Sequence, residues 1–358
     1  MRPHADTADT TIPVTRATIS RSGALVSGGM GDEGTCMLTG PAGAPMTGRR
    51  PVAVGAVIPC KNEVETITRC LAALRGQQPP LSRIVVVDNG STDGSVELAK
   101  QFADTVLEVP DGSISGLRNR GAAELAGVDV IAFVDADTEV GSNWLQAGLE
   151  ALGTGADLVG SRTRAGDDAR WVARRWAAIE AARTHSRSRV WSQHMLVRAS
   201  RFHSVGGFAD IPTGEDADLS IRIAEAGGPV TLVPGMQAIH HGFPATLRTF
   251  LRRERWHTRA PGWFPRMARG SQILVAAGAV WSGAGAILAV DALVRRRTGR
   301  LRLWAATSAI AVPALGTTTS RRPAAVLQDG LLLSIWTAIR VARLPAEMRH
   351  DRIARNGG

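Results

Sequence analysis

Two aspartates stand one residue apart directly after an apolar stretch. Asp135 and Asp137 follow VIAFV, residues 130–134, which has the composition of a buried strand. Along an extended chain, alternate side chains point the same way, so both carboxylates would lie on one side and Ala136 on the other. Two like charges so close repel each other unless a cation or hydrogen-bond donors lie between them. Because carboxylate oxygens suit Mg²⁺ or Mn²⁺, which commonly bridge to substrate phosphates, the pair predicts a metal site.

Polar residues follow two other apolar stretches in the same way. Lys61, Asn62 and Glu63 follow AVIPC, and Asp88 follows RIVVV. These stretches alternate with segments of helical spacing, such as NEVETITRCLAALRGQ and NWLQAGLEALG, which indicates βαβ units and a mostly parallel sheet flanked by helices. The continuous apolar runs suit strands covered on both faces. Ligands of such sheets bind beyond the carboxyl ends of the strands, so three strand ends are expected to meet at one site.

The basic residues are concentrated at the end of the chain. The 358 residues carry a net charge of +10, and from Arg248 onward nineteen Arg and five acids give +14, so the preceding part sums to 10 − 14 = −4. A basic tail predicts anionic partners such as membrane lipid, a phosphorylated substrate or nucleic acid. Cys36, Cys60 and Cys70 are too few and too irregularly spaced for a disulfide framework or a zinc site, which favours a reduced, cytosol-facing compartment.

Three regions differ in composition. Residues 1–50 show no sustained periodicity and predict a disordered arm without a secretory signal. Residues 51–260 hold the expected α/β domain, and residues 261–358 form a basic, helical region with one to three hydrophobic segments. The stretch Ser271–Val290 is uncharged and long enough to span a bilayer. A helical hairpin, interfacial or re-entrant helices and a packed soluble subdomain all remain open, and membrane association is the expectation common to the first two.

Five stretches resemble, in the family's order, motifs of the family 2 glycosyltransferases. The resemblance runs from about Val52 to Trp256 and implies a nucleotide-sugar-binding GT-A fold with a D-x-D motif. The last stretch resembles the R-x-x-R-W variant of a motif found in membrane-associated members. The five are VIPCKNE, VVDNGSTDGS, LRNRGAAELAGVDVIAFVDAD, the pair MLVRASRFHSVGGF and GEDADLSIRIAEAGG, and RRERW at 252–256.

On the donor side, the resemblance implies a nucleotide sugar whose diphosphate is held by a divalent metal, Mg²⁺ or Mn²⁺, on Asp137 and His240. His240 also fits a purely structural histidine at the end of a short strand. Asn89 stands where many relatives have a second acid, which leaves Asp88 alone for the ribose or base contact. Arg118 and Asn119 fit either a diphosphate contact or a solvated helix start. The full donor-binding set is Pro59, Lys61, Asn62, Glu63, Asp88, Arg118, Asn119, Asp135, Ala136 and Asp137.

On the acceptor side, the reaction needs a base for the proton of the attacking hydroxyl. Asp216 is the candidate base, and Glu215 is expected to orient the acceptor or a neighbouring group. An acid at a helix start also stabilises the helix, an alternative that stays open for Asp216 and is preferred for Asp218. The motif RRERW would let Trp256 stack on an acceptor sugar and Arg255 neutralise phosphate, or it is a juxtamembrane basic helix. The acceptor-side set is Gly207, Phe208, Arg252, Arg255 and Trp256.

The function that these features favour is inverting sugar transfer to a lipid-linked or membrane-proximal glycan acceptor at the cytoplasmic face of a cell membrane. A nucleotidyltransferase shares the sheet and the paired acids, but it needs a Gly-rich loop with a basic residue where this chain has PCKNEVET. A noncatalytic membrane-bound sugar- or nucleic-acid-binding protein is the other alternative. Because the tail arginines lack interleaved aromatic and polar base-reading residues, no nucleic acid partner is expected.

Overall fold

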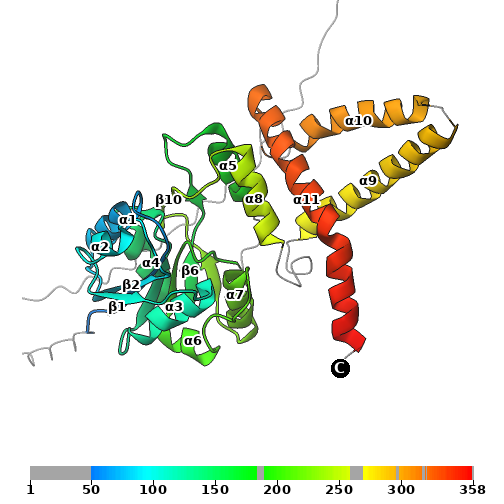
Figure 1. The fold of residues 1–358 in the computed structure, drawn as a ribbon. Helices are drawn as coiled ribbons and strands as arrows, with labels where there is room; N and C mark the ends of the chain where they lie inside the picture. The colour runs from blue at the N-terminus through cyan, green and yellow to red at the C-terminus, as the bar shows by residue number, and fades with distance from the viewer. Residues whose placement is uncertain are drawn as a thin grey trace, which may run out of the picture. The chain divides into compact units, whose positions relative to one another are not determined.

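The computed structural model describes residues 50–183, 189–258, 269–295, 298–316, 319 and 321–356. The predicted arm thus lies outside the described residues except for Arg50, and so does the predicted boundary at residue 260. The elements, shown in Figure 1, are β1 Val54–Cys60, α1 Ile67–Arg75, β2 Arg83–Asp88, α2 Ser95–Ala99, β3 Thr105–Glu108, α3 Ile114–Ala123, β4 Val130–Val134, β5 Thr138–Val140, α4 Trp144–Gly153, β6 Leu158–Gly160, β7 Thr163–Arg164, α5 Trp171–Arg183, β8 His194–Arg198, α6 Ala199–Ser204, α7 Glu215–Glu225, β9 Val230–Leu232, β10 Ala238–His240, α8 Leu247–His257, α9 Arg269–Arg295, α10 Gly299–Gly316 and α11 Pro323–Asn356.

The centre of the domain is a seven-stranded sheet in the order β3-β2-β1-β4-β8-β6-β9. Strands β1 to β4 are parallel, whereas β8 runs antiparallel to both β4 and β6. The mostly parallel sheet expected from the sequence is therefore confirmed. The antiparallel β8 has a consequence for function, because its first residues lie at the carboxyl end of β4.

Side chains of the central strand β4 alternate between two hydrophobic cores, one on each face of the sheet. Ala132 and Val134 pack among residues of α1 and α4, and Ile131 and Phe133 pack among residues of α3, α6 and α7. Both faces are therefore covered, which explains why the strand is apolar throughout and lacks the polar alternation of a half-exposed strand. Because both faces of the strand are buried, charged side chains can reach solvent or a ligand only at its ends.

The chain departs from the expected helical periodicity after β1. The helix expected from Asn62 begins only at Ile67, because the backbone N–H groups of Asn62, Glu63 and Val64 donate instead to side chains of the neighbouring loop 91–95. Asn62 itself has a φ of 56°, outside the helical region. The residues before the helix therefore form a loop that lies against the site.

A smaller sheet in the order β5-β10-β7 lies beside the carboxyl end of β4. β10 pairs antiparallel with β5, and His240 lies opposite Thr138 in this register. The pairing brings His240 next to the Asp135–Asp137 turn, about a hundred positions earlier in the chain.

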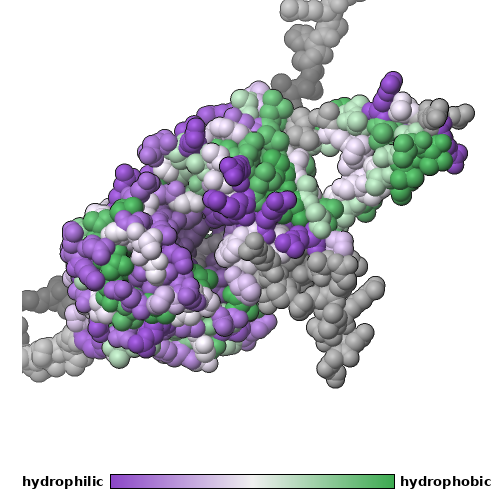
Figure 2. Space-filling view, in the orientation of Figure 1, coloured by the Kyte–Doolittle hydropathy of each residue, from purple (hydrophilic) through white to green (hydrophobic). Residues whose placement is uncertain are grey.

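Two described tail helices are long and apolar enough to cross a bilayer. In α9, the most apolar 18-residue window of Ser271–Arg295 has a mean hydropathy of 2.1, and only 11% of it is buried. In α11, the corresponding window of Pro323–Pro345 has a mean hydropathy of 1.3, and 44% of it is buried. Figure 2 shows hydrophobic residues gathered on the surface of the tail helices, whereas hydrophilic residues predominate over the α/β region.

Helix α11 is more buried than α9 because it packs on α10 and α9 and, in addition, on α5 and α8 of the α/β region. Arg175 of α5 donates from Nε and Nη2 to the two carboxylate oxygens of Asp329 at 2.7 and 2.6 Å. Asp329 is fully buried and also accepts from Thr319 Oγ1 at 2.6 Å. Leu332 and Trp336 join the hydrophobic cluster of α5 and α8. The acid that interrupts this apolar segment is thus neutralised by the protein itself.

Candidate active site

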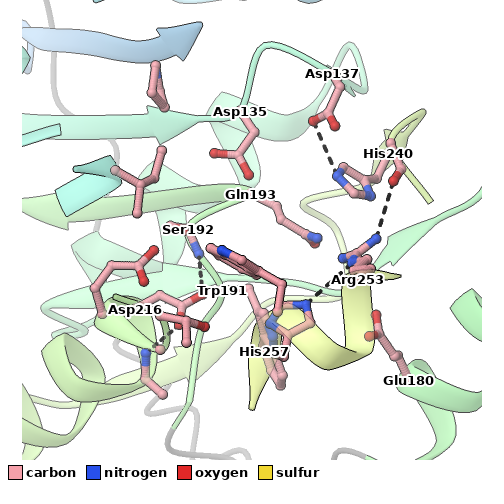
Figure 3. A pocket seen from close by; sticks show the side chains of 18 of the residues that line it. Asp135, Asp137, Glu180, Trp191, Ser192, Gln193, Asp216, His240, Arg253 and His257 are labelled. Carbon is pink, nitrogen blue, oxygen red and sulfur yellow. Dashed lines mark hydrogen bonds and ion pairs between the residues drawn. The ribbon is translucent and has the colours of Figure 1, made fainter. Parts of the chain in front are cut away.

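A cavity of about 740 Å³ opens at the carboxyl ends of β1 and β4, where the sequence predicts a site. Residues from the start of α7, from α8 and from α11 complete its walls. Figure 3 shows Asp216 of α7 and Arg253 and His257 of α8 around the cavity. Eleven of the predicted site residues line the cavity, which supports their assignment to one site: Pro59, Lys61, Glu63, Arg118, Asp135, Ala136, Asp137, Glu215, Asp216, His240 and Trp256.

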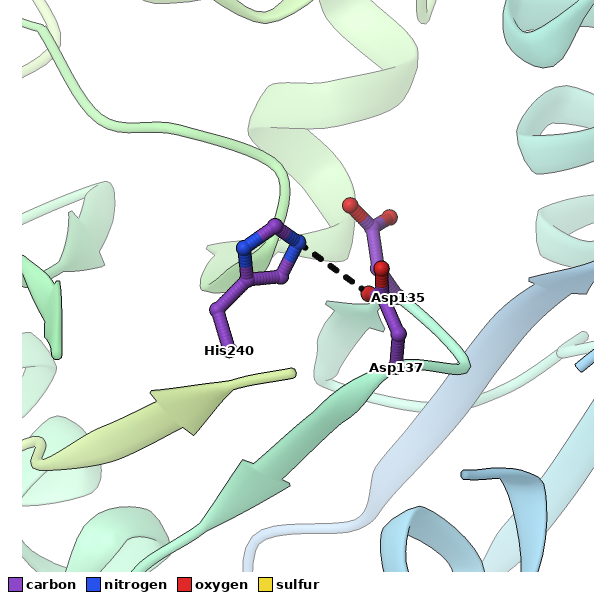
Figure 4. A group of neighbouring side chains, drawn as sticks. All are labelled: Asp135, Asp137 and His240. Atoms are coloured by element: carbon purple, nitrogen blue, oxygen red, sulfur yellow. Dashed lines mark ion pairs between the residues drawn. The ribbon is translucent and has the colours of Figure 1, made fainter. Parts of the chain in front are cut away.

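Asp135, Asp137 and His240 form a compact group in this cavity (Figure 4). One ligand atom from each residue lies within 4.8 Å of the others, and His240 Nε2 is 3.2 Å from Asp137 Oδ1. The two aspartates do not lie on an extended strand as expected. They lie in a tight turn, in which Thr138 N donates to Asp135 O at 2.9 Å. The turn still brings both carboxylates to the cavity.

The donor atoms of this group fit a divalent cation. Asp137 Oδ1 is buried, and apart from its contact with His240 Nε2 it has no hydrogen-bond partner in the described part of the chain. Burial raises the pKa of Asp137, but the attraction of His240 and Arg253 outweighs burial and keeps this pKa below its usual value. Carboxylate oxygens beside an imidazole nitrogen form a donor set that Mn²⁺ and Mg²⁺ accept. The lack of a side chain at Gly242 leaves room for the Asp137 carboxylate, since a Cβ at position 242 would collide with it.

Arg118 connects the metal turn with the acceptor-side helix. Its Nη2 donates to Asp135 Oδ1 and its Nη1 to Glu215 Oε1, both at 2.6 Å, and only 2% of the residue is exposed. Burial alone would lower the pKa of Arg118, but Asp135 and Glu215 raise it, so the guanidinium stays charged. Arg118 therefore lines the cavity as the centre of a buried ion-pair network, and Glu215 serves to hold it there.

Asp216 is the carboxylate at the start of α7 that faces the cavity. Its Oδ2 accepts from Ser192 N at 3.3 Å and its Oδ1 from Ala217 N at 2.6 Å. Burial and the adjacent Glu215 raise the pKa of Asp216 to about 7, and Arg118 only partly offsets them. A carboxyl with a pKa near neutrality is suited to accept a proton at physiological pH.

The arginine of α8 that lines the cavity is Arg253, which is not one of the two that the motif predicts. Arg253 lines the cavity, donates from Nη1 to Gly242 O at 3.2 Å and forms no ion pair with a carboxylate within the described ranges. The predicted Arg252 and Arg255 are exposed and do not line the cavity, whereas Trp256 does. The inward face of α8 thus runs through Arg253, Glu254 and His257.

The sequence carries a signal for this face. Leu247 and Phe250 are the apolar residues at helical spacing, and the same stripe continues at 254 and 257. Phe250 is fully buried, so the residues one turn further along the stripe must also face inward.

The other predicted residues that do not line the cavity have structural contacts. The Asp88 carboxylate accepts from Ser91 N at 2.8 Å and so points into its own loop. The Asn119 side chain donates to Phe208 O at 2.8 Å and accepts from Phe208 N at 2.9 Å, which ties α3 to the segment after α6. Asn62 Oδ1 accepts from Thr92 N. The complete set outside the lining is Asn62, Asp88, Asn119, Gly207, Phe208, Arg252 and Arg255.

Three tryptophans, Trp176, Trp191 and Trp336, were the main feature that motif reasoning missed. Four of the nine tryptophans in the chain line this one cavity: Trp176, Trp191, Trp256 and Trp336. Trp191 lies just before β8, whose antiparallel direction brings it to the end of β4, and Arg162 stacks on its ring at 3.9 Å. Trp256 was predicted from the RRERW motif, but no spacing rule connects it with the other three, which only their clustering in space identifies. Aromatic faces in such numbers suit a sugar ring or an apolar chain.

Comparisons with known proteins agree with this geometry. The family model Glycosyl transferase family 2 matches residues 56–205. Glycosyltransferase AglE of Haloferax volcanii is 38% identical over 116 residues, which cover 30% of this chain and only 38% of that relative. An uncharacterized glycosyltransferase of Mycobacterium bovis is 32% identical over 180 residues, 49% of this chain and 80% of the relative.

A solved structure shows the same fold. The mannosyltransferase PcManGT from Pyrobaculum calidifontis, in complex with GDP-Man and Mn²⁺, aligns with a TM-score of 0.58 at 19% identity, over 81% of this chain and 86% of that one. This likeness confirms the expected GT-A architecture, and the sequence matches confirm the expected family. The chain belongs to glycosyltransferase family 2.

Proposed function

We propose that the protein transfers a sugar from a nucleotide diphosphate sugar to a hydroxyl acceptor, with inversion at the anomeric carbon. The observation that carries the proposal is the meeting of Asp135, Asp137 and His240 with Asp216 in one cavity. The first three residues suit the charged leaving group, and the last suits the proton of the attacking hydroxyl.

On the donor side, Asp137 and His240 would hold the cation, with Asp135 beside them. When bound, Mg²⁺ or Mn²⁺ would neutralise charge on the departing diphosphate. Arg253 adds a fixed positive charge at the same wall of the cavity. Among the described residues, its guanidinium donates to Gly242 O and, weakly, to His257, and it lies over the Phe243 ring, so that it keeps N–H donors available for phosphate oxygens.

On the acceptor side, the hydroxyl oxygen attacks the anomeric carbon as the bond to the diphosphate breaks. The hydroxyl proton passes to Asp216, which backbone N–H groups of Ser192 and Ala217 hold in place. A single displacement of this kind inverts the configuration of the sugar. Trp191 and Trp256 offer aromatic faces for the acceptor in the same cavity.

The acceptor is proposed to be lipid-linked or membrane-proximal. The cavity wall includes Ser271 of α9 and Arg340 of α11, so the site extends to the two helices that are long enough to cross a bilayer. Residues 51–260 would act as the catalytic domain at the cytoplasmic face of a membrane, and residues 261–358 as its anchor. The arginines of the tail would then contact anionic headgroups.

The test is nucleoside diphosphate release by the full-length protein in vesicles, with a panel of nucleotide sugars, with Mg²⁺, Mn²⁺ or EDTA, and with or without a polyprenyl phosphate acceptor. We expect acceptor-dependent release of nucleoside diphosphate with one donor, abolished by EDTA. Release of pyrophosphate from a nucleoside triphosphate would support a nucleotidyltransferase instead. Absence of turnover with every donor would refute the proposed reaction.

A further inference from the structure

We infer that the tail helix α11 is part of the catalytic unit, and that Arg340 is a positioning residue that sets the orientation of Arg253 through Glu254. This inference rests on the proposed function, since it concerns the same diphosphate site. It predicts that a substitution in a helix suited to a membrane changes metal and donor binding in the α/β domain.

The contact between α11 and α8 is a buried ion pair. Arg340 Nη1 donates to Glu254 Oε2 at 2.9 Å, and the two side chains are only 10% and 2% exposed. The guanidinium of Arg340 lies 3.9 Å from the centre of the Trp336 ring on its own helix. Stacking on one side and the carboxylate on the other hold Arg340 in one place. Glu254 is thus held by a group that itself has little freedom.

From Glu254 a short series of contacts leads to the metal group. Its neighbour Arg253 donates to Gly242 O at 3.2 Å. Gly242 in turn lies so close to Asp137 that there is no room for a Cβ between them. A rotation of α8 about its axis would therefore move Arg253 away from the cavity wall and remove the support of the loop that faces Asp137 and His240.

A second ion pair restricts how α11 can move. The Arg175–Asp329 pair ties the start of α11 to α5, three turns before Arg340. Two fixed points along one helix define its rotation as well as its position. Residues between them, Leu332 and Trp336, pack in the cluster that contains Phe250 of α8. The helix is thereby rigidly aligned with α8, as a positioning element must be.

Substitutions at Arg340 and Glu254 distinguish a role of Arg340 in positioning α8 from a role in stabilising the fold alone. Arg340→Met leaves the Glu254 charge buried and alone, so both the melting temperature and activity should fall. Glu254→Gln combined with Arg340→Met removes both charges, so the melting temperature should recover. If Arg340 positions α8, the double variant still lacks the directional contact. Its kcat/KM for the nucleotide sugar should then remain about 10- to 100-fold low, because small misplacements of a charge at the reacting group have effects of this size.

The measurements are made on full-length protein in vesicles: kcat and KM for the donor, Mn²⁺ affinity by calorimetry without donor, and thermal melting. Arg340→Lys should keep more activity than the Met variant, since the charge remains. Arg343→Met, an exposed arginine one turn further along α11, is the matched control and should equal wild type.

Two results would overturn the inference. One is a double variant that regains both melting temperature and kcat/KM, because the pair would then only stabilise the fold. The other is an Arg340→Met protein with unchanged Mn²⁺ affinity and an unchanged KM. A wild-type protein without transferase activity would refute the proposed function, and the Mn²⁺ affinities of the variants would still test the role of Arg340.

Discussion

The pH dependence of transfer offers the most direct test of the role of Asp216. Burial and the neighbouring Glu215 raise its pKa from 3.8 to about 7. With this pKa, the ionised fraction is about a tenth at pH 6, one half at pH 7 and about nine-tenths at pH 8. Because only the ionised carboxylate can accept the proton, the rate should rise about fivefold from pH 6 to pH 7 and level off above pH 8. An aspartate with an ordinary pKa would contribute no change in rate over this range, and the Asp216→Asn variant separates its contribution from those of Glu63 and His240 in the same cavity.

Asp216→Asn removes the base and should lower kcat about 10²- to 10⁴-fold at pH 8, and the remaining activity should no longer rise with pH. Donor binding in Mn²⁺ should change little, because Asp216 is not part of the metal group. Asn keeps an acceptor for only one of the N–H groups of Ser192 and Ala217, so a stability loss of about 1 kcal/mol is expected.

The matched control is Asp218→Asn on the same helix turn. The Asp218 carboxylate accepts from Arg222 Nε at 2.7 Å and does not line the cavity, so this variant should keep the wild-type rate and pH profile. Initial rates of nucleoside diphosphate release at saturating donor provide the assay. Near-native transfer by Asp216→Asn with normal melting would show that another group takes the proton.

Three further predictions concern the metal group and the core. Asp137→Asn should abolish Mn²⁺-dependent donor binding in calorimetry without lowering the melting temperature, and binding at the wild-type level would remove Asp137 from the metal site. Gly242→Ala should reduce Mn²⁺ affinity at least about tenfold because its Cβ would collide with the Asp137 carboxylate; Gly153→Ala, where a Cβ meets nothing within 4 Å, is the control. His194 is buried, and burial lowers its pKa from 6.5 to about 3. Between pH 6.5 and about 3, His194 therefore takes up a proton only when the chain unfolds. The free energy of unfolding should accordingly have its full value above pH 6.5 and fall by about 1.4 kcal/mol per pH unit below about pH 6. His194→Gln, which still offers an acceptor to Trp144 Nε1, should remove that slope in urea titrations, and an unchanged slope would contradict the assignment.

The α/β architecture could be predicted because it depends on local patterns. Buried parallel strands must be apolar on both faces, so VGAVIPC, RIVVVD and VIAFV are recognisable without knowledge of their neighbours. The direction of β8 could not be predicted in this way. HMLVR reads as a strand in either orientation, and only its pairing with β4 and β6 decides that it runs antiparallel.

The surroundings of the tail helices could not be predicted from the sequence, for a similar reason. Apolar residues predict burial, but not whether lipid or protein provides it. The Arg175–Asp329 pair, whose aspartate is fully buried, shows that α11 packs on the protein, whereas α9 leaves most of its apolar residues exposed. The mean hydropathies of the most apolar windows of α9 and α11 are 2.1 and 1.3, a difference too small to distinguish these surroundings.

The sequence by itself determined the strand-end acids and the helix-start acid Asp216, because short motifs of this kind are contiguous in the chain. Tertiary structure alone decided which groups surround them. Arg118 became the buried link between Asp135 and Glu215, and Arg253 replaced the predicted arginines, because a helix turns about 100° per residue and packing decides which face is inward. Such contacts join residues far apart in sequence, and they arise only when the burial of one hydrophobic core settles the orientation of every element at once.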